Sequence, residues 1–428
     1  MRYIGDFHLH SRFAQASSKK ITFPSLEKWA RKKGLDVLGT GDAAHPVWNK
    51  EVKEQLKDEH GIGIYRSKTG FPFVLEMEIS LIYTHLGKGR RVHHVILFPS
   101  SAVLDQVIEY LLKHGRLDYD GRPIFNITSE QLVADLRSIS QDIEVIPAHI
   151  WTPWFAMFGS KSGYDSLQDC FGNQSQHIHA IETGISSDPQ MNWRVPELDE
   201  KNIISFSDSH SFWPWRLGRE ATMFELPELT YKNLLRGIRT GKGLAGTVET
   251  EPAYGRYHWD GHRNCNFSCG PEESKRLQGI CPVCKKPLTI GVDYRVEELA
   301  KRPATYKRKG APPYWKLMPL HELIAAVTGK GLATKDTWTT YNRLLAECKD
   351  ENTVLLETPA HELARVVDED LVKTIIANRE QRIDVIPGYD GEYGKLKLDW
   401  VDQGRIAESS KKNEEVKQAQ KGLRDYFS

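Results

Sequence analysis

The chain has 428 residues, of which 39% are hydrophobic and 27% are charged, and its formal net charge is +1. This length exceeds what one ordinary hydrophobic core supports, so we expect two or three domains. No apolar stretch is long enough to cross a bilayer, which excludes a membrane-spanning protein and predicts an intracellular, cytoplasmic one without a signal peptide. The near-neutral charge neither demands nor excludes nucleic acid.

Strand-like and helix-like segments alternate over residues 1–247. Strands are expected at residues 3–9, 37–40, 73–81, 94–98, 144–148, 180–183 and 203–207. Helices are expected between several of them, at residues 24–33, 104–114, 129–138 and 229–240. Such alternating units predict an α/β fold with a parallel sheet or a barrel, and a barrel carries its active site at the C-terminal strand ends.

Six short segments at the ends of these expected strands carry side chains that bind metal ions. They contain His8 and His10, Asp42, Glu76 and Glu78, His93 and His94, His149, and Asp208 and His210. On an alternating strand His8 and His10 project from one face, so one ion can bind both rings. A single histidine of this kind is more often an ordinary core or surface residue. Six ordered clusters favour a multinuclear hydrolytic metal centre.

The order of these motifs resembles that of the polymerase-and-histidinol-phosphatase (PHP) superfamily over about residues 1–247. The resemblance rests on His8-x-His10, the Gly41-Asp42 turn, Glu78, His94, Ala148-His149 and Ser207-Asp208-Ser209-His210. It implies a distorted seven-stranded (β/α) barrel that binds two or three divalent metal ions, zinc with Mg²⁺ or Mn²⁺ as further candidates. Members of the superfamily use such ions to hydrolyse phosphate esters.

The same resemblance implies a ligand set. One metal is bound by the catalytic residues His8, His10, Glu78 and Asp208, a second by Glu78, His94 and His149, and a third by Asp42 and His210. We expect the loss of Asp208 to abolish turnover. The superfamily commonly has Thr-Asp-His where this chain has Gly41-Asp42-Ala43, so either Asp42 or the nearby His45 substitutes for the usual ligand. The usual histidine shortly after His-x-His is also missing, because residues 11–18 contain none.

Two of these ligands are chosen between neighbours. Glu76 and Glu78 share one strand face, and Glu78 is preferred because it begins a Glu-Ile-Ser segment that resembles the superfamily motif. His93 and His94 point to opposite faces of their strand, so only one of them can bind the metal. The motif selects His94.

Four of the six cysteines form the pattern Cys265-x3-Cys269-x11-Cys281-x2-Cys284. Two such pairs can place four thiolates around one structural zinc ion, which predicts a small zinc-ribbon domain over residues 251–300. This cysteine usage fits a reducing compartment better than a disulfide framework. A ribbon of this kind either contacts nucleic acid or simply holds a domain together.

Residues 301–316 contain six cationic residues, three aromatic residues and no acidic ones. Cations for phosphates with aromatic rings for exposed bases are typical of DNA contacts. The candidates are Lys307, Arg308, Lys309, Tyr314 and Trp315. The alternative is a solvated linker. Helices are expected at residues 320–327, 339–347, 360–365 and 371–379, so residues 301–400 are interpreted as a basic linker with a helical DNA-contacting region.

Residues 401–428 form a charged tail that we expect to be flexible. The tail ends in Gln420-x2-Leu423-x2-Tyr426-Phe427, which matches the sliding-clamp interaction box. One helical turn places the leucine and the two aromatic rings on one face, with Gln420 as a polar contact. The alternative is a tail that folds back on its own domain.

The barrel, the zinc site, the helical region and the terminal box together resemble the endonuclease Q family over essentially the whole chain. The resemblance implies a repair nuclease, associated with the nucleoid, that nicks damaged duplex or single-stranded DNA on the 5′ side of uracil, hypoxanthine, xanthine or an abasic site. The products carry a 3′-hydroxyl and a 5′-phosphate. A monomer is the plain expectation. The alternatives are a phosphomonoesterase of the histidinol-phosphatase type and a non-catalytic DNA-binding factor.

Base selection requires residues other than metal ligands, because metals do not read bases. Two aromatic-rich loops follow His149 and His210. We expect one or two tryptophans of these loops to stack beside a flipped base, and the candidates are Trp151, Trp154, Trp213 and Trp215. Arg216 and Arg219 are the candidates for contacts with phosphates. The alternative is ordinary core or lid packing.

Overall fold

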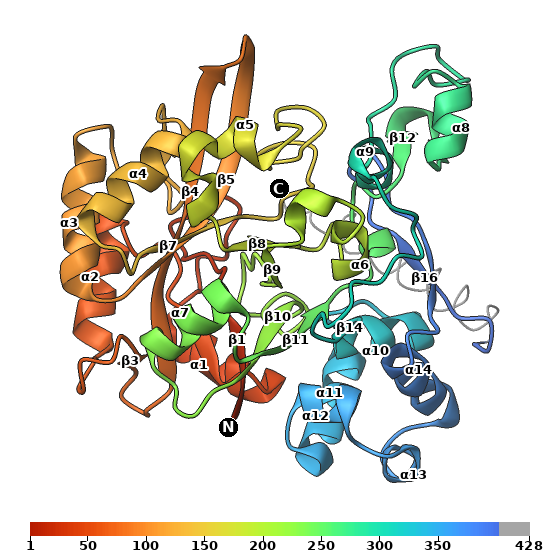
Figure 1. Ribbon diagram of the computed structural model, residues 1–428. Coiled ribbons are helices and arrows are strands. Elements are labelled where there is room, and N and C mark those ends of the chain that lie inside the picture. Colours follow the sequence, from red (N-terminus) through yellow and green to blue (C-terminus); the bar gives the residue numbers. More distant parts are fainter. Residues whose placement is uncertain (402–428) are drawn as a thin grey trace, which may run out of the picture.

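The structure, a computed structural model, describes residues 1–401 and is built around one large, curved sheet (Figure 1). The strand order is β14-β11-β10-β1-β2-β4-β5-β7, and β3 and β6 also pair with β4. The strands are β1 (Arg2–Asp6), β2 (Val37–Gly39), β3 (Tyr65–Arg66), β4 (Pro72–His85), β5 (Lys88–Phe98), β6 (Ile124–Phe125), β7 (Glu144–Pro147), β10 (Ala221–Glu225), β11 (Leu244–Glu249) and β14 (Tyr314–Lys316). The predicted clamp-binding residues, Gln420, Leu423, Tyr426 and Phe427, lie outside the described residues.

A separate parallel pair, β8 (Ala180–Glu182) and β9 (Asn202–Ile204), lies between the β7 end of this sheet and β1. Past the end of β7, the Ile150 N–H donates to the Glu182 carbonyl (3.1 Å). Past the end of β9, Ser209 pairs in parallel with Leu9, just beyond β1. The strands therefore curl around an interior, and the α/β class is confirmed.

The parallel pairing expected from alternating strands and helices does not hold for β5, which runs antiparallel to both β4 and β7. The two-residue turn Leu86-Gly87 joins β4 to β5, and both turn residues have positive φ (51° and 71°). Such a turn matches the twist of an antiparallel hairpin. β10 is likewise antiparallel to β1.

The helices around the sheet begin and end at residues with suitable capping chemistry. Thr22 caps α1 (Phe23–Lys33) by accepting a hydrogen bond from the Ser25 N–H, and Gly34 ends it with a φ of +88°. The other helices of this half are α2 (Pro46–Gln55), α3 (Ser101–Leu112), α4 (Ser129–Ile139), α5 (Leu167–Phe171), α6 (Pro189–Asn192) and α7 (Tyr231–Thr240), with the 3₁₀ turns η1 (Gly172–His177) and η2 (Pro196–Leu198).

Two smaller parts follow β11, one around a short hairpin and one made of helices (Figure 1). The first contains η3 (Pro252–Tyr254), β12 (Asp260–His262), η4 (Arg263–Cys265), β13 (Phe267–Cys269), α8 (Pro271–Arg276) and α9 (Val292–Leu299). The second contains α10 (Leu320–Thr328), α11 (Lys335–Cys348), α12 (Glu351–Leu356), α13 (Ala360–Leu363), α14 (Glu369–Arg379) and the hairpin β15 (Asp384–Ile386) with β16 (Lys395–Lys397). β14, which ends the basic segment, pairs with β11 of the main sheet.

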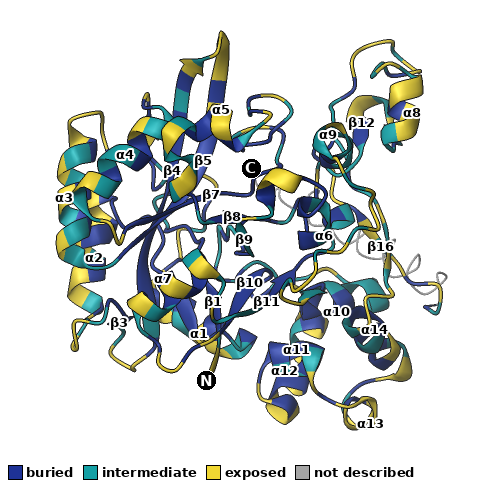
Figure 2. Cartoon of the chain, in the orientation of Figure 1, coloured by how far each residue is buried: buried dark blue, intermediate teal, exposed yellow. Residues whose placement is uncertain are grey.

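The core follows this arrangement: buried residues fill the strands and the inner sides of the helices, as the dark blue segments of Figure 2 show. Within residues 1–401, no helix combines the length and the apolar character needed to span a membrane.

Two buried glutamates, Glu220 and Glu249, face each other beside β10 and β11. The Ser205 hydroxyl lies within hydrogen-bond distance of both carboxyl groups, at 3.2 and 2.9 Å. Burial raises the pKa of Glu220 to about 8 and that of Glu249 well above its usual range, and the repulsion between the two carboxylates adds to the shift at Glu249. The folded protein thus retains carboxyl protons on these glutamates. The unfolded chain releases the same protons once the pH exceeds the usual pKa of glutamate.

This linkage predicts that stability falls as pH rises through the window between the usual glutamate pKa and about 8, by up to about 1.4 kcal/mol per pH unit for each retained proton. The double variant Glu220→Gln, Glu249→Gln is expected to show a flatter dependence. Urea unfolding of both proteins from pH 5 to pH 8 measures the difference. Parallel pH profiles for the two proteins would contradict it.

Candidate active site

Histidines and carboxylates from several strand ends meet inside the curled sheet. Beyond the end of β1, the chain continues through His8 and His10, which pair with the segment that follows β9. The His10 N–H donates to the Ser209 carbonyl (3.0 Å), and the Ser209 N–H donates to the His8 carbonyl (3.2 Å). These bonds fix the two imidazoles beside Asp208.

Three residues of this region adopt a backbone conformation that L-residues rarely use. The φ angles are +45° at Asp42, +30° at His149 and +47° at Asp208. Such conformations cost free energy and cluster at functional sites, where the surrounding structure holds them. All three are among the ligands expected from the sequence.

Four side chains form a first ligand group, with their ligand atoms within 4.8 Å of one another: His8, His10, Glu78 and Asp208. His10 Nε2 lies 3.1 Å from Asp208 Oδ1 and 3.2 Å from Glu78 Oε2. His8 Nε2 lies 3.5 Å from Glu78 Oε1 and, within the described chain, has no hydrogen-bond partner. A buried imidazole nitrogen that faces carboxylates without a hydrogen bond fits a metal ligand.

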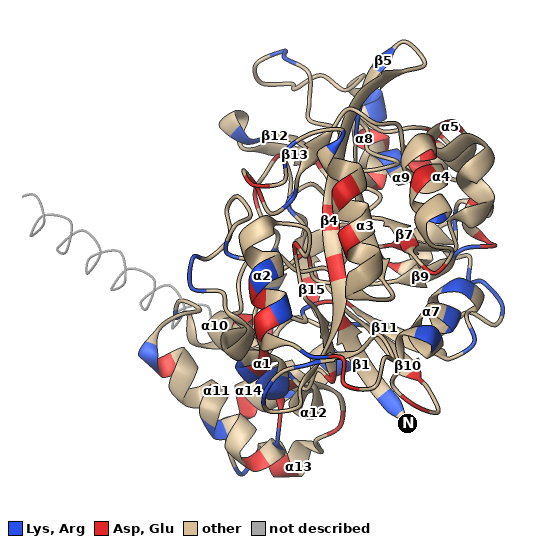
Figure 3. Ribbon diagram, turned by 90° about the vertical axis from the view of Figure 1, so that its left-hand side faces the viewer, with Lys and Arg blue, Asp and Glu red and all other residues tan. Residues whose placement is uncertain are grey.

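A second group consists of Glu78, His93 and His149. Glu78 Oε1 lies 2.7 Å from His93 Nδ1 and 3.2 Å from His149 Nε2. Glu78 therefore belongs to both groups and would be shared by the metal ions that they hold. The carboxyl group of Glu76, on the same strand, instead accepts a hydrogen bond from the Gly41 N–H (3.0 Å). Acidic residues, red in Figure 3, lie along β4 in the interior of the molecule.

The choice of His94 as a ligand is corrected to His93. In the β4–β5 ladder His93 lies opposite Ser80, which shares a face with Glu78, whereas His94 lies opposite Ile79. His94 Nε2 is 2.9 Å from the hydroxyl of Ser129, on the side away from both ligand groups.

Each histidine of the first group is oriented by a carboxylate on its other ring nitrogen. Glu182 lies 2.9 Å from His8 Nδ1, and Asp42 lies 3.0 Å from His10 Nδ1. In the second group, the Thr152 hydroxyl lies 3.2 Å from His149 Nδ1. Such outer contacts fix the tautomer and ring orientation of metal-binding histidines. Glu182 was not predicted from the sequence, since a single glutamate at the end of a short strand carries no motif.

The residues assigned to a third metal, Asp42 and His210, are not brought together in a ligand group. Both oxygens of Asp42 are engaged, one with His10 and the other with the Ser11 N–H (2.6 Å). His210 Nδ1 lies 3.2 Å from the Asp208 carbonyl, and its ring packs edge-on against His10. Within residues 1–401 the barrel contains two ligand groups of this kind, and Asp42 contacts the His10 ring from outside both of them.

The electrostatics of the centre favour ionised carboxylates. Burial opposes charge on Glu78, but His93 and Arg122 outweigh it and hold the Glu78 pKa well below its usual range. Burial likewise opposes charge on Asp208, and His210 and His10 lower its pKa well below the usual value. The donor set of imidazoles and ionised carboxylates fits divalent metal ions.

The small domain contains a third ligand group, and it differs from the predicted one. Its members are His262, Cys265, Cys281 and Cys284, and His262 Nδ1 lies 3.4 Å from Cys284 Sγ. Cys269 is buried beside this group but is not part of it. The ladder of β12 and β13 sets this placement, because it pairs Cys269 with Asp260 and leaves His262 next to the thiols. The prediction of four thiolates is therefore corrected to one imidazole and three thiolates.

Most of the aromatic residues nominated for a flipped base lie in packing positions. Trp151 is fully buried, and its indole N–H donates to Asn192 Oδ1 (2.8 Å). Trp213 and Trp215 stack on each other, with ring centroids 5.4 Å apart, and both contact Trp338 of the helical part. Trp154, with 37% of its surface exposed, remains available.

Of the two arginines expected to contact phosphates, one is buried and the other lies beside an exposed aromatic ring. The Arg219 guanidinium is buried and donates to the Ser207 carbonyl at 3.0 and 3.1 Å, so its assignment to phosphate is wrong. Arg216 lies 5.4 Å from the ring of Tyr393, on the β15–β16 hairpin, and Arg256 lies 5.4 Å from the same ring. Tyr393 is 37% exposed and was not predicted as a functional residue.

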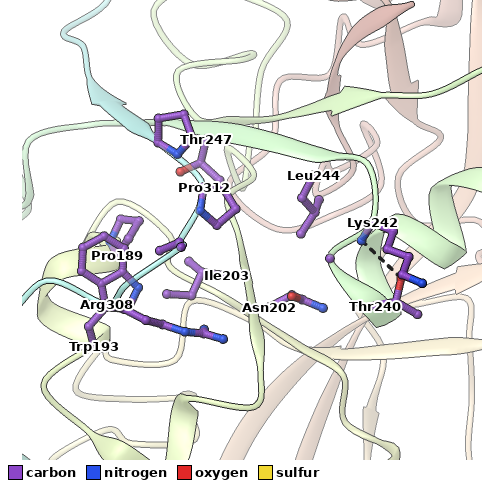
Figure 4. Close-up of a pocket in the computed structure, with 14 residues that line it drawn as sticks. Pro189, Trp193, Asn202, Ile203, Thr240, Lys242, Leu244, Thr247, Arg308 and Pro312 are labelled. Atoms are coloured by element: carbon purple, nitrogen blue, oxygen red, sulfur yellow. Dashed lines mark hydrogen bonds between the residues drawn. The ribbon is translucent and has the colours of Figure 1, made fainter.

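The basic segment lies partly against the barrel. Lys307 and Lys309 are exposed, whereas Tyr314 and Trp315 are half-buried in β14. The Arg308 guanidinium donates to the Lys201 carbonyl (3.3 Å). Arg308 also lines a cavity of about 330 Å³ with Trp193, Asn202 and Lys242, near the N-terminal end of β9 (Figure 4). The ligand groups lie past the opposite, C-terminal end of that strand.

Solved structures and related sequences resemble the chain over different lengths. The crystal structure of the lesion-specific endonuclease PfuEndoQ from Pyrococcus furiosus matches with a TM-score of 0.83 and 31% identity, covering 95% of this chain and 97% of that one. The chain belongs to the endonuclease Q family. A second endonuclease Q structure, in complex with a 27-mer duplex that has an abasic lesion at the active site, matches with a TM-score of 0.84 and 32% identity, covering 95% of this chain and 98% of that one.

Membership in the endonuclease Q family makes the chain an enzyme, a metal-dependent endonuclease of the hydrolase class. A family model described as the MJ0043 C-terminal domain matches residues 319–382, which span most of the helical part. The protein MJ0043 of Methanocaldococcus jannaschii is 30% identical over 300 residues, or 68% of this chain. This alignment spans only 36% of the length of MJ0043.

Proposed function

We propose that the protein is a DNA repair endonuclease that hydrolyses the phosphodiester bond on the 5′ side of deaminated bases (uracil, hypoxanthine, xanthine) and of abasic sites, leaving a 3′-hydroxyl and a 5′-phosphate. The observation that carries the proposal is the pair of ligand groups that share Glu78, in a chain of the endonuclease Q family. The abasic-lesion duplex bound by the second endonuclease Q structure supports damaged DNA as the substrate class.

The residues of the centre have separable roles in this reaction. When bound, two divalent ions activate a water molecule and neutralise charge on the phosphate. Glu182 and Asp42 hold the imidazoles of His8 and His10 in one tautomer, so their free nitrogens stay aimed at the reacting site. The strained backbone at Asp208 aims its carboxylate at the same point.

The group of His262, Cys265, Cys281 and Cys284 supports one structural zinc ion in the small domain. We expect His262→Ala to lose this zinc, since it removes a ligand, and Cys269→Ser to retain it. Elemental analysis of the purified variants measures zinc per chain. If the Cys269 variant lost zinc and the His262 variant retained it, the result would support a site of four thiolates instead.

Trp154 and Tyr393 are the exposed aromatic residues we assign to the DNA bases around the lesion. Trp154 follows the ligand His149 along the chain, and Tyr393 lies beside Arg216, which follows the ligand Asp208. Stacking on an aromatic ring is worth about 1–3 kcal/mol per base, so Trp154→Ala should weaken binding of a lesion-containing duplex by roughly 10- to 100-fold.

The variant Trp154→Phe is the matched control, because it keeps an aromatic face, and it should bind nearly as well as the wild type. Fluorescence anisotropy with a labelled abasic-site duplex measures both affinities. Equal affinity of the alanine and phenylalanine variants would remove Trp154 from the DNA surface.

The C-terminal sequence Gln420-x2-Leu423-x2-Tyr426-Phe427 supports binding to a DNA sliding clamp, which would recruit the enzyme to DNA in the cytoplasm near the nucleoid. The protein is proposed to act as a monomer. Removal of the last nine residues should abolish clamp binding in a pull-down with purified clamp and leave nicking of a short free duplex unchanged.

One experiment tests the proposed function against its alternative. Duplexes that contain uracil, hypoxanthine, xanthine or an abasic site are incubated with the purified protein, with and without a chelator. Chelator-sensitive nicks 5′ to the lesion, absent from undamaged duplex, are the expected result. Hydrolysis of small phosphomonoesters without nicking of damaged DNA would favour the histidinol-phosphatase type instead.

A further inference from the structure

Arg122 approaches the shared carboxylate of the centre. Its Nη1 donates to Glu78 Oε2 at 3.2 Å, and its side chain is 24% exposed. The other ion-pair partners of Glu78 among residues 1–401 are histidines: His8, His10, His93 and His149. Arg122 is thus the permanently charged cation of the centre, on the side of Glu78 that faces His10 and Asp208.

The backbone around Arg122 is fixed. The Arg122 N–H donates to Asp120 Oδ1 (3.1 Å), and the next carbonyl, of Pro123, accepts from the Ser80 N–H on β4 (3.0 Å). Gly121 passes so close to Asp42 that a Cβ atom there would lie 2.1 Å from Asp42 Oδ2. Position 121 therefore requires glycine, because the backbone there passes so close to Asp42. This close approach places the guanidinium of the next residue, Arg122, at the centre.

Charge compensation of Glu78 alone does not require a guanidinium at this position. Four imidazoles already surround that carboxylate, and its position in both ligand groups assigns it to metal ions. The carboxylates beside Arg122 are assigned to metal ions, and its guanidinium is only partly exposed to solvent. An anion that enters the centre is therefore its most suitable ion-pair partner. The planar, forked donors of arginine match two oxygens of a phosphate.

We propose that Arg122 is a catalytic residue that binds a non-bridging oxygen of the scissile phosphate and stabilises the charge that develops there. The inference rests on the proposed function. It also accounts for the absence of a third ligand group around Asp42 and His210 in the described part of the barrel, because Arg122 supplies a fixed positive charge on that side of the centre.

The test compares Arg122→Ala with Arg122→Lys and with the control Arg116→Ala. Arg116 lies in the same loop but is exposed and paired with Asp118. At saturating metal, the single-turnover rate on an abasic-site duplex should fall about 10²- to 10³-fold in Arg122→Ala, the usual cost of one lost transition-state donor. Arg122→Lys should recover part of this loss, and Arg116→Ala should match the wild type.

Three further readouts separate this role from a structural one. The metal content of Arg122→Ala should equal that of the wild type, and guanidinium ions at sub-denaturing concentration should restore part of its rate. DNA affinity should change by less than about tenfold, since the contact strengthens in the transition state. These outcomes together support a direct contact with the phosphate.

The proposal is overturned if Arg122→Ala cleaves at the wild-type rate, if its activity loss follows loss of metal and returns when metal is added, or if guanidinium gives no rescue while Arg122→Ala remains folded and metal-loaded. Failure of the proposed function looks different. In that case the wild-type protein itself nicks none of the lesion duplexes.

Discussion

Glu78→Gln is expected to abolish nicking and to lower the metal content of the barrel. Glu78 contributes one oxygen toward His8, His93 and His149 and the other toward His10 and Arg122. An amide keeps the shape of the side chain but removes the negative charge that the two ligand groups share. Loss of several kcal/mol of transition-state stabilisation corresponds to a rate decrease of at least about 10³-fold.

Glu76→Gln is the matched control for this experiment. Glu76 lies on the same strand face and is also fully buried, but its carboxyl group accepts from the Gly41 N–H and belongs to neither ligand group. Glutamine can keep that hydrogen bond, so the variant should retain its metals and nick within about tenfold of the wild-type rate. Nicking assays and elemental analysis of both variants give the answer. If Glu76→Gln lost its metals while Glu78→Gln kept them, the shared ligand would be Glu76.

The ligand types of the centre were predictable from the sequence, but the choice among neighbouring residues depends on the register between strands. His93 and His94 differ only in which face they occupy, and the sequence alone gave no partner strand. The turn Leu86-Gly87 contains the missing information. A two-residue hairpin turn there fixes the pairing of β4 with β5 and places His93, not His94, on the face of Glu78.

In the small domain, too, sequence proximity and spatial proximity differ. A count of cysteines selects Cys269, because it is near Cys265 in sequence. The spacing His262-x2-Cys265 has the same length as Cys281-x2-Cys284, and the structure brings those two pairs together. Imidazole and thiolate are equivalent choices for tetrahedral zinc, so a search for histidine at knuckle spacing would have found the observed group.

Other residues of the site had no local signal. Glu182 and Arg122 reach the centre only because β8 and the loop before β6 pack against the ligand-bearing strands. Trp213 and Trp215 follow a ligand segment and look available in sequence, yet the helical part covers them. Long-range packing decides these positions, and a single sequence does not contain it.

The same packing depends on one buried ion pair between the barrel and the helical part. Lys33, at the end of α1, is 2% exposed, and its Nζ lies 2.6 Å from Glu351 Oε1 and 2.9 Å from the Pro214 carbonyl. Glu351 is fully buried and also accepts from the Leu320 N–H (2.9 Å) and the Tyr341 hydroxyl (3.0 Å). The pair therefore joins α1, the loop that contains Trp213, Pro214 and Trp215, and the helices α10 to α12.

Lys33→Met should destabilise the protein by about 3–5 kcal/mol, because it leaves the Glu351 carboxylate buried without a counter-charge. Adding Glu351→Gln should recover much of this loss, since the amide oxygen can still accept from Leu320 and Tyr341. The control Lys50→Met breaks an exposed pair with Glu54 and should cost less than about 1 kcal/mol. Urea unfolding gives the free energies, and limited proteolysis shows whether the helical part detaches first. If Lys33→Met cost no more than the control, the interface would be held by its aromatic contacts rather than by this ion pair.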